Sequence, residues 1–562
     1  MLNNQNNLFK NFKTMRKIFL FYPILILILF SACNQMKEKV DLVVFNTKVY
    51  TVDKNFTIAQ SFAVKDGKFY DVGTNEEILR KYTSNNTYNA VGLTIYPGLI
   101  DGHCHFYYYG LGILRNADLT GTESFNEVLE ILKVHQKNNQ EKWLIGRGWD
   151  QNDWKISEFP DKDELDKLFP DIPVYLTRID GHAALVNSKA LEKAGITKNT
   201  KINGGDIIIK NGEPSGVLID NATELVSALI PKPGRFQKEN AFLTAQKECF
   251  QVGLTSIVDA GLPMETIKII DSLQKSGKLK MRINSMLGSD DENFVKNIEA
   301  GTYKTPRHTV RAIKLFSDGA LGSRGAMLKK PYSDKKSNRG FLVQDTKYYK
   351  NICKKAFENG FQVCTHAIGD SAVKFMLMTY GEVLKDTNDL RWRIEHSQIV
   401  DPADFYLYHK YSIIPSIQAT HATSDMYWAE KRIGKERMKG AYAYQDLLKQ
   451  NGWLINGTDF PIENINPMLT FYASVARKDT KGYPENGFQM ENALSREEAL
   501  KSMTIWAAKG SFEENEKGSI EIGKLADFVV LTKDIMEIDE EKLPDVKVVR
   551  TYINGETVFS NK

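Results

Sequence analysis

The sequence predicts an α/β fold built on a (β/α)₈ barrel. Between residues 95 and 510, short apolar or β-branched runs alternate with helical stretches, as in repeated βα units. Eight such runs occur, and eight parallel strands close a TIM barrel. The predicted strands are residues 94–100, 254–259, 281–287, 312–316, 361–366, 391–396, 411–417 and 453–459.

A β-rich segment is predicted at each end of the mature chain. Short strand-like runs separated by turns fill residues 40–94, where Asp66-Gly67 is a hairpin signal. The same pattern of short strand-like runs separated by turns occurs in residues 511–562. Because chain termini commonly lie close together, we expect the two segments to form one small β-sandwich domain beside the barrel.

The predicted barrel strands are evenly spaced except after the first. Residues 106–250 are too long for one loop and carry strand and helix patterns of their own, so we expect an inserted subdomain there. The insertion begins at the C-terminal end of a barrel strand, and barrel enzymes have their active sites at this end of the barrel. We therefore expect it to cover the mouth of the site and to supply substrate contacts.

Residues 1–33 have the pattern of a secretory signal. A basic stretch, a short apolar run and two small residues lead to Cys33. This order is typical of bacterial lipoprotein signals, in which the cysteine is lipidated, although Phe30 stands where leucine is usual. An uncleaved membrane anchor is the alternative, but the run is short for a span. Both interpretations place the protein at a membrane outside the cytoplasm, on the periplasmic side or at the outer membrane. A start at Met15 gives a tighter signal than a start at Met1.

Composition excludes several classes of protein. The 74 basic and 70 acidic residues nearly cancel, which leaves no broad positive field of the kind that nucleic acid requires. With 42% hydrophobic and 26% charged residues, the chain is an ordinary globular protein and not a disordered one. The cysteines after Cys33 lack CxxC spacing, so no disulfide framework is predicted.

Candidate metal ligands gather at the C-terminal ends of the predicted strands. His103 and His105 are two residues apart, so on an extended chain both face one side and can bind a single ion. An isolated His-x-His is weak evidence by itself. Four further strand ends carry Lys314, His366, His396 and Asp459. Their shared position at one end of a barrel predicts a metal site.

Several motifs resemble the amidohydrolase superfamily. The segment Pro97-Gly-Leu-Ile-Asp-Gly-His-Cys-His, with the histidines of strands five and six and the aspartate of strand eight, is similar to the ligand series of that family. Longer strings that begin at Ile313, Thr365, Arg393 and Gly457 resemble the amidohydrolase-3 branch, which includes N-substituted formamide deformylases. The resemblance extends through nearly all of the mature chain.

The resemblance implies two metal positions. His103, His105 and Asp459 would hold one ion, His366 and His396 would hold a second, and Lys314, carboxylated by CO₂, would bridge them. Neutral imidazoles and a carboxylate suit Zn²⁺, and other divalent metals stay open. A bare ammonium would repel cations, so the alternative is a salt-bridged Lys314 beside a single metal.

The predicted reaction is hydrolysis of a non-peptide carbon–nitrogen bond, in an amide or N-substituted formamide, by metal-bound hydroxide. Asp459 is suited to take the proton from the attacking water and to deliver it to the leaving nitrogen. The partner is a small-molecule substrate, and the oligomeric state is open, a homo-oligomer included.

One alternative is ester, lactone or phosphoester hydrolysis at the same site, because a fold does not fix the leaving group. Another is a non-catalytic ligand-binding lipoprotein, which would show broken ligand sets.

Other residues are candidates for contacts around the metal site. Asp101 and Glu395 could orient the ligand imidazoles, with a solvated turn carboxylate as the alternative for each. His182, in the predicted insertion, resembles a family motif and could polarise the substrate carbonyl, although a structural histidine is the alternative.

Three residues are candidates for binding the substrate directly. Arg324 could bind an acidic end of the substrate, with a loop-fixing salt bridge as the alternative. His421 follows strand seven and could line the pocket. Trp149 could form an apolar wall, although aromatic residues are also ordinary core. We expect His308 to be a surface group.

Overall fold

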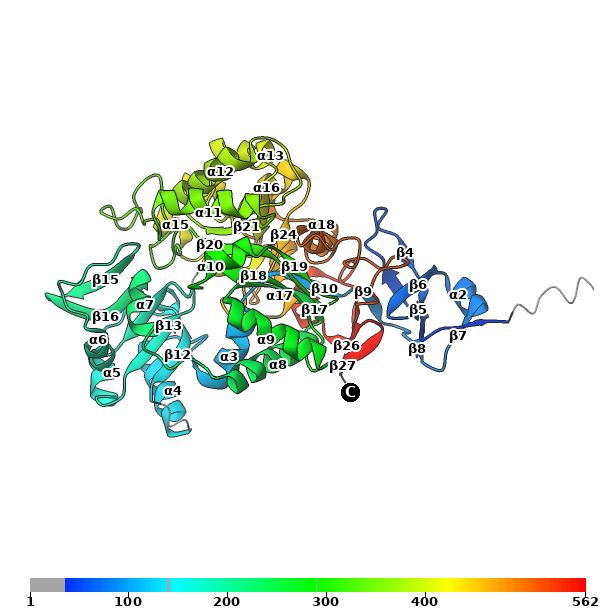
Figure 1. The fold of residues 1–562 in the computed structure, drawn as a ribbon, viewed down its shortest axis with the longest axis horizontal. Helices are drawn as coiled ribbons and strands as arrows, with labels where there is room; N and C mark the ends of the chain where they lie inside the picture. Colours follow the sequence, from blue (N-terminus) through cyan, green and yellow to red (C-terminus); the bar gives the residue numbers. More distant parts are fainter. Residues whose placement is uncertain (1–35, 139–141, 290, 562) are drawn as a thin grey trace, which may run out of the picture.

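The computed structural model describes residues 36–138, 142–289 and 291–561. Its centre is a sheet of parallel strands in the order β10-β17-β18-β20-β21-β22-β23-β24, and β10 also contacts β24, so the ring is nearly closed (Figure 1). This confirms the predicted (β/α)₈ barrel. The strands are β10 (Leu99–Cys104), β17 (Leu254–Leu262), β18 (Arg282–Gly288), β20 (His308–Phe316), β21 (Gln362–Ala367), β22 (Arg393–His396), β23 (Ile414–Ile417) and β24 (Ile455–Asn456). The short β19 (Tyr303–Lys304) pairs with β20 in the antiparallel sense.

Helices cover the barrel on its outside, and the strands are accordingly buried along nearly their whole length. α11 shows how the sequence starts one of them, because the Asp345 carboxylate accepts the backbone N–H of Tyr348 at 2.8 Å as an N-cap. The helices of the barrel region, including α14 at the mouth of the cavity, are α3 (Phe106–Arg115), α8 (Arg235–Gln251), α9 (Met264–Lys275), α10 (Phe294–Glu299), α11 (Thr346–Glu358), α12 (Asp370–Leu384), α13 (Tyr406–Lys410), α14 (Ala419–Asp425), α15 (Ala429–Ile433), α16 (Tyr444–Asn451), α17 (Pro467–Ala476), α18 (Arg496–Ser502) and α19 (Ile505–Gly510).

The first barrel strand lies further along the chain than the sequence predicts. Part of the expected strand, Thr94–Pro97, forms β9, which pairs antiparallel with β25 (Phe528–Leu531) in a separate sheet. The barrel strand β10 starts after Gly98, where a Cβ atom would lie 2.3 Å from Thr255 Oγ1. Only glycine therefore lets the chain pass from one sheet into the other at this point. As a result, His103 lies inside the barrel strand and not beyond its end.

Two further sheets combine both ends of the described chain (Figure 1, right). One has the order β6-β5-β2-β8 and the other the order β27-β26-β25-β9-β3-β4. They share an apolar core in which the Phe62 and Phe528 rings lie 5.0 Å apart, centroid to centroid. The remaining elements here are β1 (Glu38–Lys39), β2 (Leu42–Phe45), β3 (Lys48–Tyr50), β4 (Ile58–Ala59), β5 (Ser61–Lys65), β6 (Lys68–Gly73), α2 (Asn75–Lys81), β7 (Tyr82–Thr83), β8 (Thr87–Asn89), β26 (Val548–Ile553) and β27 (Glu556–Ser560).

A six-stranded sheet follows α3 and projects from the barrel (Figure 1, left). Its order is β11-β12-β13-β14-β16-β15, and it has apolar cores of its own. α3 and α8, which flank it in the sequence, pack against each other and against β17 of the barrel. Its elements are β11 (Ala117–Asp118), α4 (Phe125–Asn138), β12 (Leu144–Trp149), α5 (Asp163–Leu168), β13 (Val174–Arg178), β14 (Ala183–Val186), α6 (Ser188–Ala194), β15 (Gly205–Lys210), β16 (Glu213–Asp220) and α7 (Asn221–Ser227).

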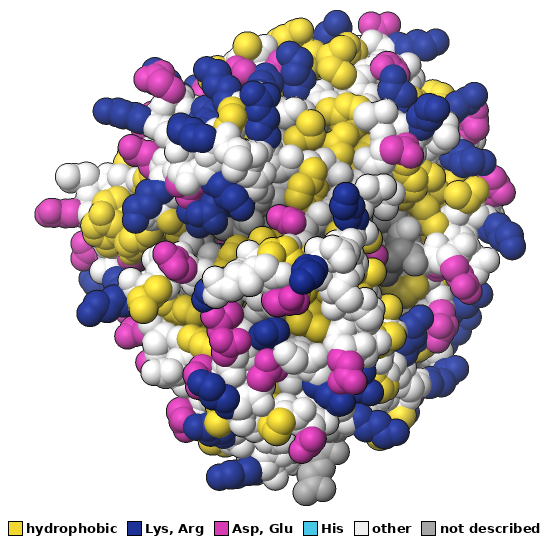
Figure 2. All heavy atoms as spheres, turned by 90° about the vertical axis from the view of Figure 1, so that its left-hand side faces the viewer, with side chains coloured by type: hydrophobic (Ala, Val, Ile, Leu, Met, Phe, Trp, Pro, Cys, Tyr) yellow, Lys and Arg dark blue, Asp and Glu magenta, His cyan; other side chains and the backbone are white. Residues whose placement is uncertain are grey.

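The predicted signal and Cys33 lie outside the described residues. Among the residues that are described, no helix is long and apolar enough to cross a membrane. The four later cysteines, Cys104, Cys249, Cys353 and Cys364, are free and buried. Positive and negative side chains are intermixed on the face of the molecule shown in Figure 2, in agreement with the small net charge of +4.

Candidate active site

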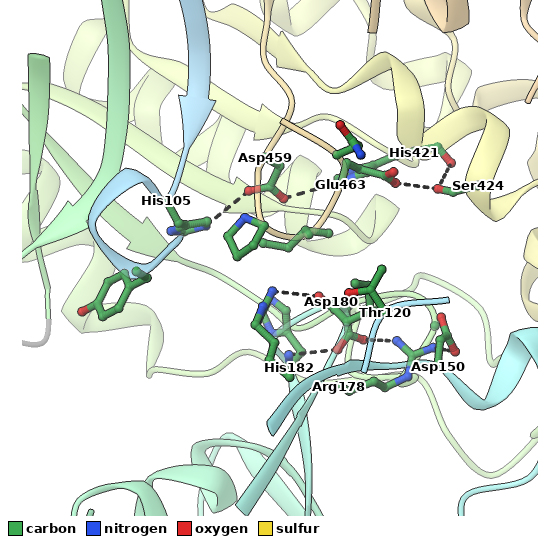
Figure 3. A pocket seen from close by; sticks show the side chains of 18 of the residues that line it. His105, Thr120, Asp150, Arg178, Asp180, His182, His421, Ser424, Asp459 and Glu463 are labelled. Atoms are coloured by element: carbon green, nitrogen blue, oxygen red, sulfur yellow. Dashed lines mark hydrogen bonds and ion pairs between the residues drawn. The ribbon is translucent and has the colours of Figure 1, made fainter. Parts of the chain in front are cut away.

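His103, His105 and Asp459 converge at the C-terminal end of the barrel. Asp459 Oδ1 lies 3.2 Å from His105 Nε2 and 3.5 Å from His103 Nε2 (Figure 3 shows His105 and Asp459). One ligand atom from each of the three residues lies within 4.8 Å of the others. Asp459 Oδ1 is buried, and no described residue makes a hydrogen bond to it. Buried polar atoms are normally satisfied, so this arrangement fits a divalent cation between the three groups.

The loop after β24 is held against β10 by close backbone contacts. A Cβ atom on Gly457 would lie 2.5 Å from the backbone nitrogen of His103, so a larger residue would push the loop away. Asp459 has a left-handed φ of 61°, and its N–H donates to the His103 carbonyl at 2.8 Å. Asp101 accepts the Thr458 hydroxyl at 2.7 Å and the His103 N–H at 3.1 Å. Asp101 thus fixes the two backbones and not an imidazole ring.

Glu395 orients the His103 ring. Its Oε2 lies 2.5 Å from His103 Nδ1, and Arg393 Nε approaches its Oε1 to 2.6 Å. Burial opposes ionisation, but the charge of Arg393 and the hydrogen bond from His103 hold the pKa of Glu395 well below its usual range. The ionised carboxylate accepts from Nδ1–H, which leaves Nε2 of His103 facing the candidate cation.

His366, His396 and Lys314 lie beside the three converging ligands. The ring centroids of His366 and His396 are 4.6 Å apart, and His396 Nδ1 lies 2.6 Å from Gln418 Oε1. Lys314 is fully buried, with Nζ 3.2 Å from His103 Nε2. Burial lowers the pKa of the Lys314 amine. Within the described chain Lys314 has no ion pair with a carboxylate, so the alternative of a salt-bridged lysine finds no partner there.

His182 reaches from the six-stranded sheet towards the barrel. Its ring centroid lies 4.7 Å from that of His366, and its Nδ1 lies 2.6 Å from Asp220 Oδ1. Burial disfavours protonation, but the hydrogen bond and charge of Asp220 outweigh it and raise the pKa of His182. Asp220 has a φ of 48° and fits against Gly319 and Gly325, where a Cβ atom would lie 2.3 Å from its Oδ2. The barrel loop therefore has to be glycine-rich for Asp220 to support His182.

These groups line one cavity of about 730 Å³. Figure 3 shows its two sides: Asp459 and His105 come from barrel loops, and His182 and Arg178 come from the six-stranded sheet. His421 also lies in the wall, with Nε2 3.7 Å from Asp459 Oδ2. A concave cavity of this size, with a few converging polar groups, is typical of a small-molecule site.

Comparison with known proteins decides the family. The sequence model of the amidohydrolase family matches residues 86–559. The chain belongs to the amidohydrolase family. It is 32% identical over 524 residues to the protein YtcJ of Bacillus subtilis (strain 168), covering 91% of this chain and 98% of that one. It is 24% identical over 545 residues to the N-substituted formamide deformylase of Arthrobacter pascens, covering 92% and 98%.

A solved structure agrees with this assignment. The amidohydrolase chain superposes on an uncharacterized metal-dependent hydrolase from Pyrococcus horikoshii OT3 with a TM-score of 0.72 and 27% sequence identity. The superposition covers 89% of this chain and 99% of the other. The protein is therefore a metal-dependent hydrolase of the amidohydrolase-3 branch, and the His103, His105 and Asp459 cluster is its candidate metal site.

Three sequence predictions for this amidohydrolase need correction. Arg324 does not line the cavity, because its guanidinium is ion-paired with Asp334 at 2.9 Å. Trp149 does not line it either; it is buried in the core of the six-stranded sheet, and its indole N–H donates to the Leu176 carbonyl at 2.9 Å. His308 is buried, not a surface group, because it begins the barrel strand β20.

Sequence reasoning missed three residues of the amidohydrolase cavity region. Gln418, which holds the His396 ring, follows β23, and Asp220, which holds the His182 ring, ends β16. Both residues lie at the end of a strand. The metal ligands were predicted from the same position, so it could also have identified these two residues. Arg147, which lines the cavity, lies inside β12 and has no motif that marks it.

Proposed function

We propose that this amidohydrolase hydrolyses a non-peptide carbon–nitrogen bond, in an amide or N-substituted formamide of a small molecule. The convergence of His103, His105 and Asp459 in a cavity of about 730 Å³ carries the proposal. The likeness to the Arthrobacter pascens N-substituted formamide deformylase supports the choice of bond.

The metal is proposed to be Zn²⁺, because two imidazoles and a carboxylate are ligands that it favours. A bound Zn²⁺ lowers the pKa of a water molecule to about 7 and polarises a carbonyl group. His366 and His396 are proposed to hold a second ion, since burial keeps their pKa well below 6.5 and the rings neutral. Lys314, carboxylated by CO₂, would join the two positions.

Asp459 is the proposed proton carrier. Burial opposes ionisation, but the surrounding histidines hold its pKa well below 3.8, so the carboxylate is charged at neutral pH. With Oδ1 directed at His103 and His105, Oδ2 is the atom that can accept a proton from water and pass it to the leaving nitrogen.

His182 is proposed to stabilise the substrate oxygen. The hydrogen bond from Nδ1 to Asp220 leaves Nε2–H as the donor on the cavity side of the ring. A donor in that position favours the negative charge that develops on a carbonyl oxygen under attack.

A substrate panel tests the proposed bond type. The metal-reconstituted protein is assayed on formamides and acetamides beside esters, lactones and phosphoesters of matched size, with Asp459→Asn as the inactive control. We expect the highest kcat/KM among the amides and loss of that turnover in Asp459→Asn. Turnover confined to esters, lactones or phosphoesters would establish the alternative reaction, and no turnover of any compound would favour a binding protein.

We also propose that the protein is an extracytoplasmic, membrane-anchored lipoprotein. The basic stretch, apolar run and small residues before Cys33 support this. Cys33→Ala should move the protein from the membrane fraction to the soluble fraction and abolish its labelling by a fatty-acid analogue. Unchanged membrane association would point to an uncleaved anchor instead.

A further inference from the structure

We infer that Arg147 binds a negatively charged group on the substrate, a carboxylate in the first instance, and so selects acidic amides for the hydrolytic site. The inference rests on the proposed function, since it names the substrate class of that same cavity.

Arg147 stands where two cavities meet. It lies in β12, the strand next to the β11 edge of the six-stranded sheet, and lines the catalytic cavity of about 730 Å³. It also lines a neighbouring cavity of about 1150 Å³. His105 and His182 line both as well. A substrate whose amide lies near these histidines can therefore extend the rest of its structure past the guanidinium.

The Arg147 guanidinium is poorly satisfied by the protein itself. Its Nη2 donates to the Ile179 carbonyl at 2.9 Å, while its Nε is buried without a hydrogen-bond partner among the described residues. No carboxylate of a described residue lies within ion-pairing distance. Burial lowers the pKa of Arg147, yet a guanidinium stays protonated in proteins. Arg147 is half-buried, and a partly desolvated charge without a carboxylate partner is costly, so a ligand that supplies the opposite charge is favoured here.

The nearby carboxylates are already engaged. Asp180, whose charge acts most strongly on Arg147, accepts from Arg178 Nη1 at 2.6 Å and from the His182 N–H at 3.0 Å. Asp118 is the β-sheet neighbour of Arg147, but its carboxylate accepts the Thr120 N–H at 3.0 Å. Neither acid therefore provides a dedicated counter-ion for Arg147.

The second cavity is basic overall. Six Lys and Arg side chains line it against four Asp and Glu side chains. Lys238 is paired with Glu265 at 2.7 Å, whereas Lys232 and Lys268 have no ion pair with any described carboxylate. A lining of this sign attracts anions towards Arg147. The basic cavity beside Arg147 thus favours an amide whose carboxylate lies on the side of the molecule that enters this cavity.

A matched pair of substrates tests the inference by kinetics. N-formyl-leucine and N-formyl-leucinamide differ at one group, a carboxylate or a neutral carboxamide on the carbon that carries the formamide nitrogen, and release of formate is measured for both. We expect the wild type to prefer the acid by about tenfold or more in kcat/KM, as one charge-assisted contact allows. Arg147→Gln should remove that preference, by raising KM for the acid more than KM for the neutral amide. Arg147→Lys should keep part of it, because the charge remains but the fork of donors is lost.

Arg324→Gln is the control variant, because Arg324 is bound to Asp334 outside the cavity. It should leave the preference for the acid unchanged. Equal kcat/KM values for acid and amide in the wild type, or an equal loss for both substrates in Arg147→Gln, would overturn the role of Arg147.

Binding gives a readout that does not depend on turnover. Calorimetric titration of the metal-loaded protein with hexanoate and hexanamide should show tighter binding of hexanoate to the wild type, and no such preference in Arg147→Gln. A preference that survives in Arg147→Gln would place the carboxylate at the metal and overturn the inference. A preference that depends on Arg147, in a protein that hydrolyses no amide, would support the anion site while rejecting the proposed reaction.

Discussion

Glu395 Oε2 lies 2.5 Å from His103 Nδ1, although 292 residues separate the two in the sequence. The contact joins the first and sixth strands of the barrel through the interior and fixes which nitrogen of His103 faces the candidate cation. Arg393, two residues before Glu395, keeps the carboxylate charged. One buried ion pair therefore sets the geometry of one candidate metal ligand.

Glu395→Gln should weaken metal binding by about 10- to 100-fold, because the uncharged amide no longer holds His103 in the binding tautomer. Competition with a chelator of known affinity measures the change. Glu463→Gln is the matched control, since Glu463 also lines the cavity but accepts the Ser424 hydroxyl and touches no ligand imidazole. Equal metal affinities in the two variants would contradict the orienting role of Glu395.

Asp459→Asn should lower kcat by about 10²- to 10⁴-fold, because the amide cannot accept and return the proton. Metal content should fall by much less, since one side-chain oxygen remains near His103 and His105. Steady-state kinetics with metal analysis of the same preparation separates the two effects. Asp153→Asn, at an exposed carboxylate of the same cavity, should stay close to wild type. A proportional loss of metal and activity in Asp459→Asn would show that Asp459 acts only as a metal ligand and not as a proton carrier.

His182→Ala should lower kcat by about 10²-fold, because a donor to the substrate oxygen is removed. Asp220→Asn should give a smaller loss in the same parameter, since the ring stays in place but loses the charge that favours its protonated form. His409→Ala, at an exposed histidine, is the control. If His182→Ala changed KM and left kcat intact, His182 would bind the substrate without assisting the reaction.

Asp259 should make stability depend on pH. Burial raises the pKa of Asp259 from 3.8 to about 7 in the folded protein, although the Tyr107 N–H donates to its carboxylate. The folded state therefore holds the proton more tightly than the unfolded state does. The resulting stabilisation is complete below about pH 4 and is lost as the pH rises to about 7.

Asp259→Asn keeps an acceptor for Tyr107 and removes the titration. Thermal midpoints measured from pH 4 to pH 7 should therefore fall less in Asp259→Asn than in the wild type. Asp206→Asn, at an exposed carboxylate, should follow the wild type. Parallel curves for Asp259→Asn and the wild type would show that Asp259 is ionised in the folded protein throughout this range.

The barrel was predictable because its strands are buried on both faces and so read as apolar runs between helices. The exact start of the first strand was not, because residues 94–104 form one apolar stretch that two sheets share. Only the close approach of Gly98 to Thr255, 157 residues further on, shows where the chain changes sheets.

The candidate ligands were predictable because parallel strands bring their C-terminal ends together, so strand-end histidines and aspartates had to meet. Glu395 was a candidate to orient an imidazole, but the sequence did not show that this imidazole is His103. Asp220 was not a candidate, because its contact with His182 joins distant parts of the chain. Arg324 and Arg147 also show that the sequence does not reveal contacts between distant residues. Arg324 and Arg147 carry the same charge, and only the position of Asp334 shows that Arg324 is already paired.

Metal analysis of the purified protein tests the central claim most directly. After reconstitution and removal of free metal, we expect at least one equivalent of a divalent transition metal per wild-type chain. His103→Ala should contain substantially less and should lose turnover of the best substrate. Less than one equivalent in the wild type, together with undiminished turnover in His103→Ala, would contradict a metal-dependent site built on His103, His105 and Asp459.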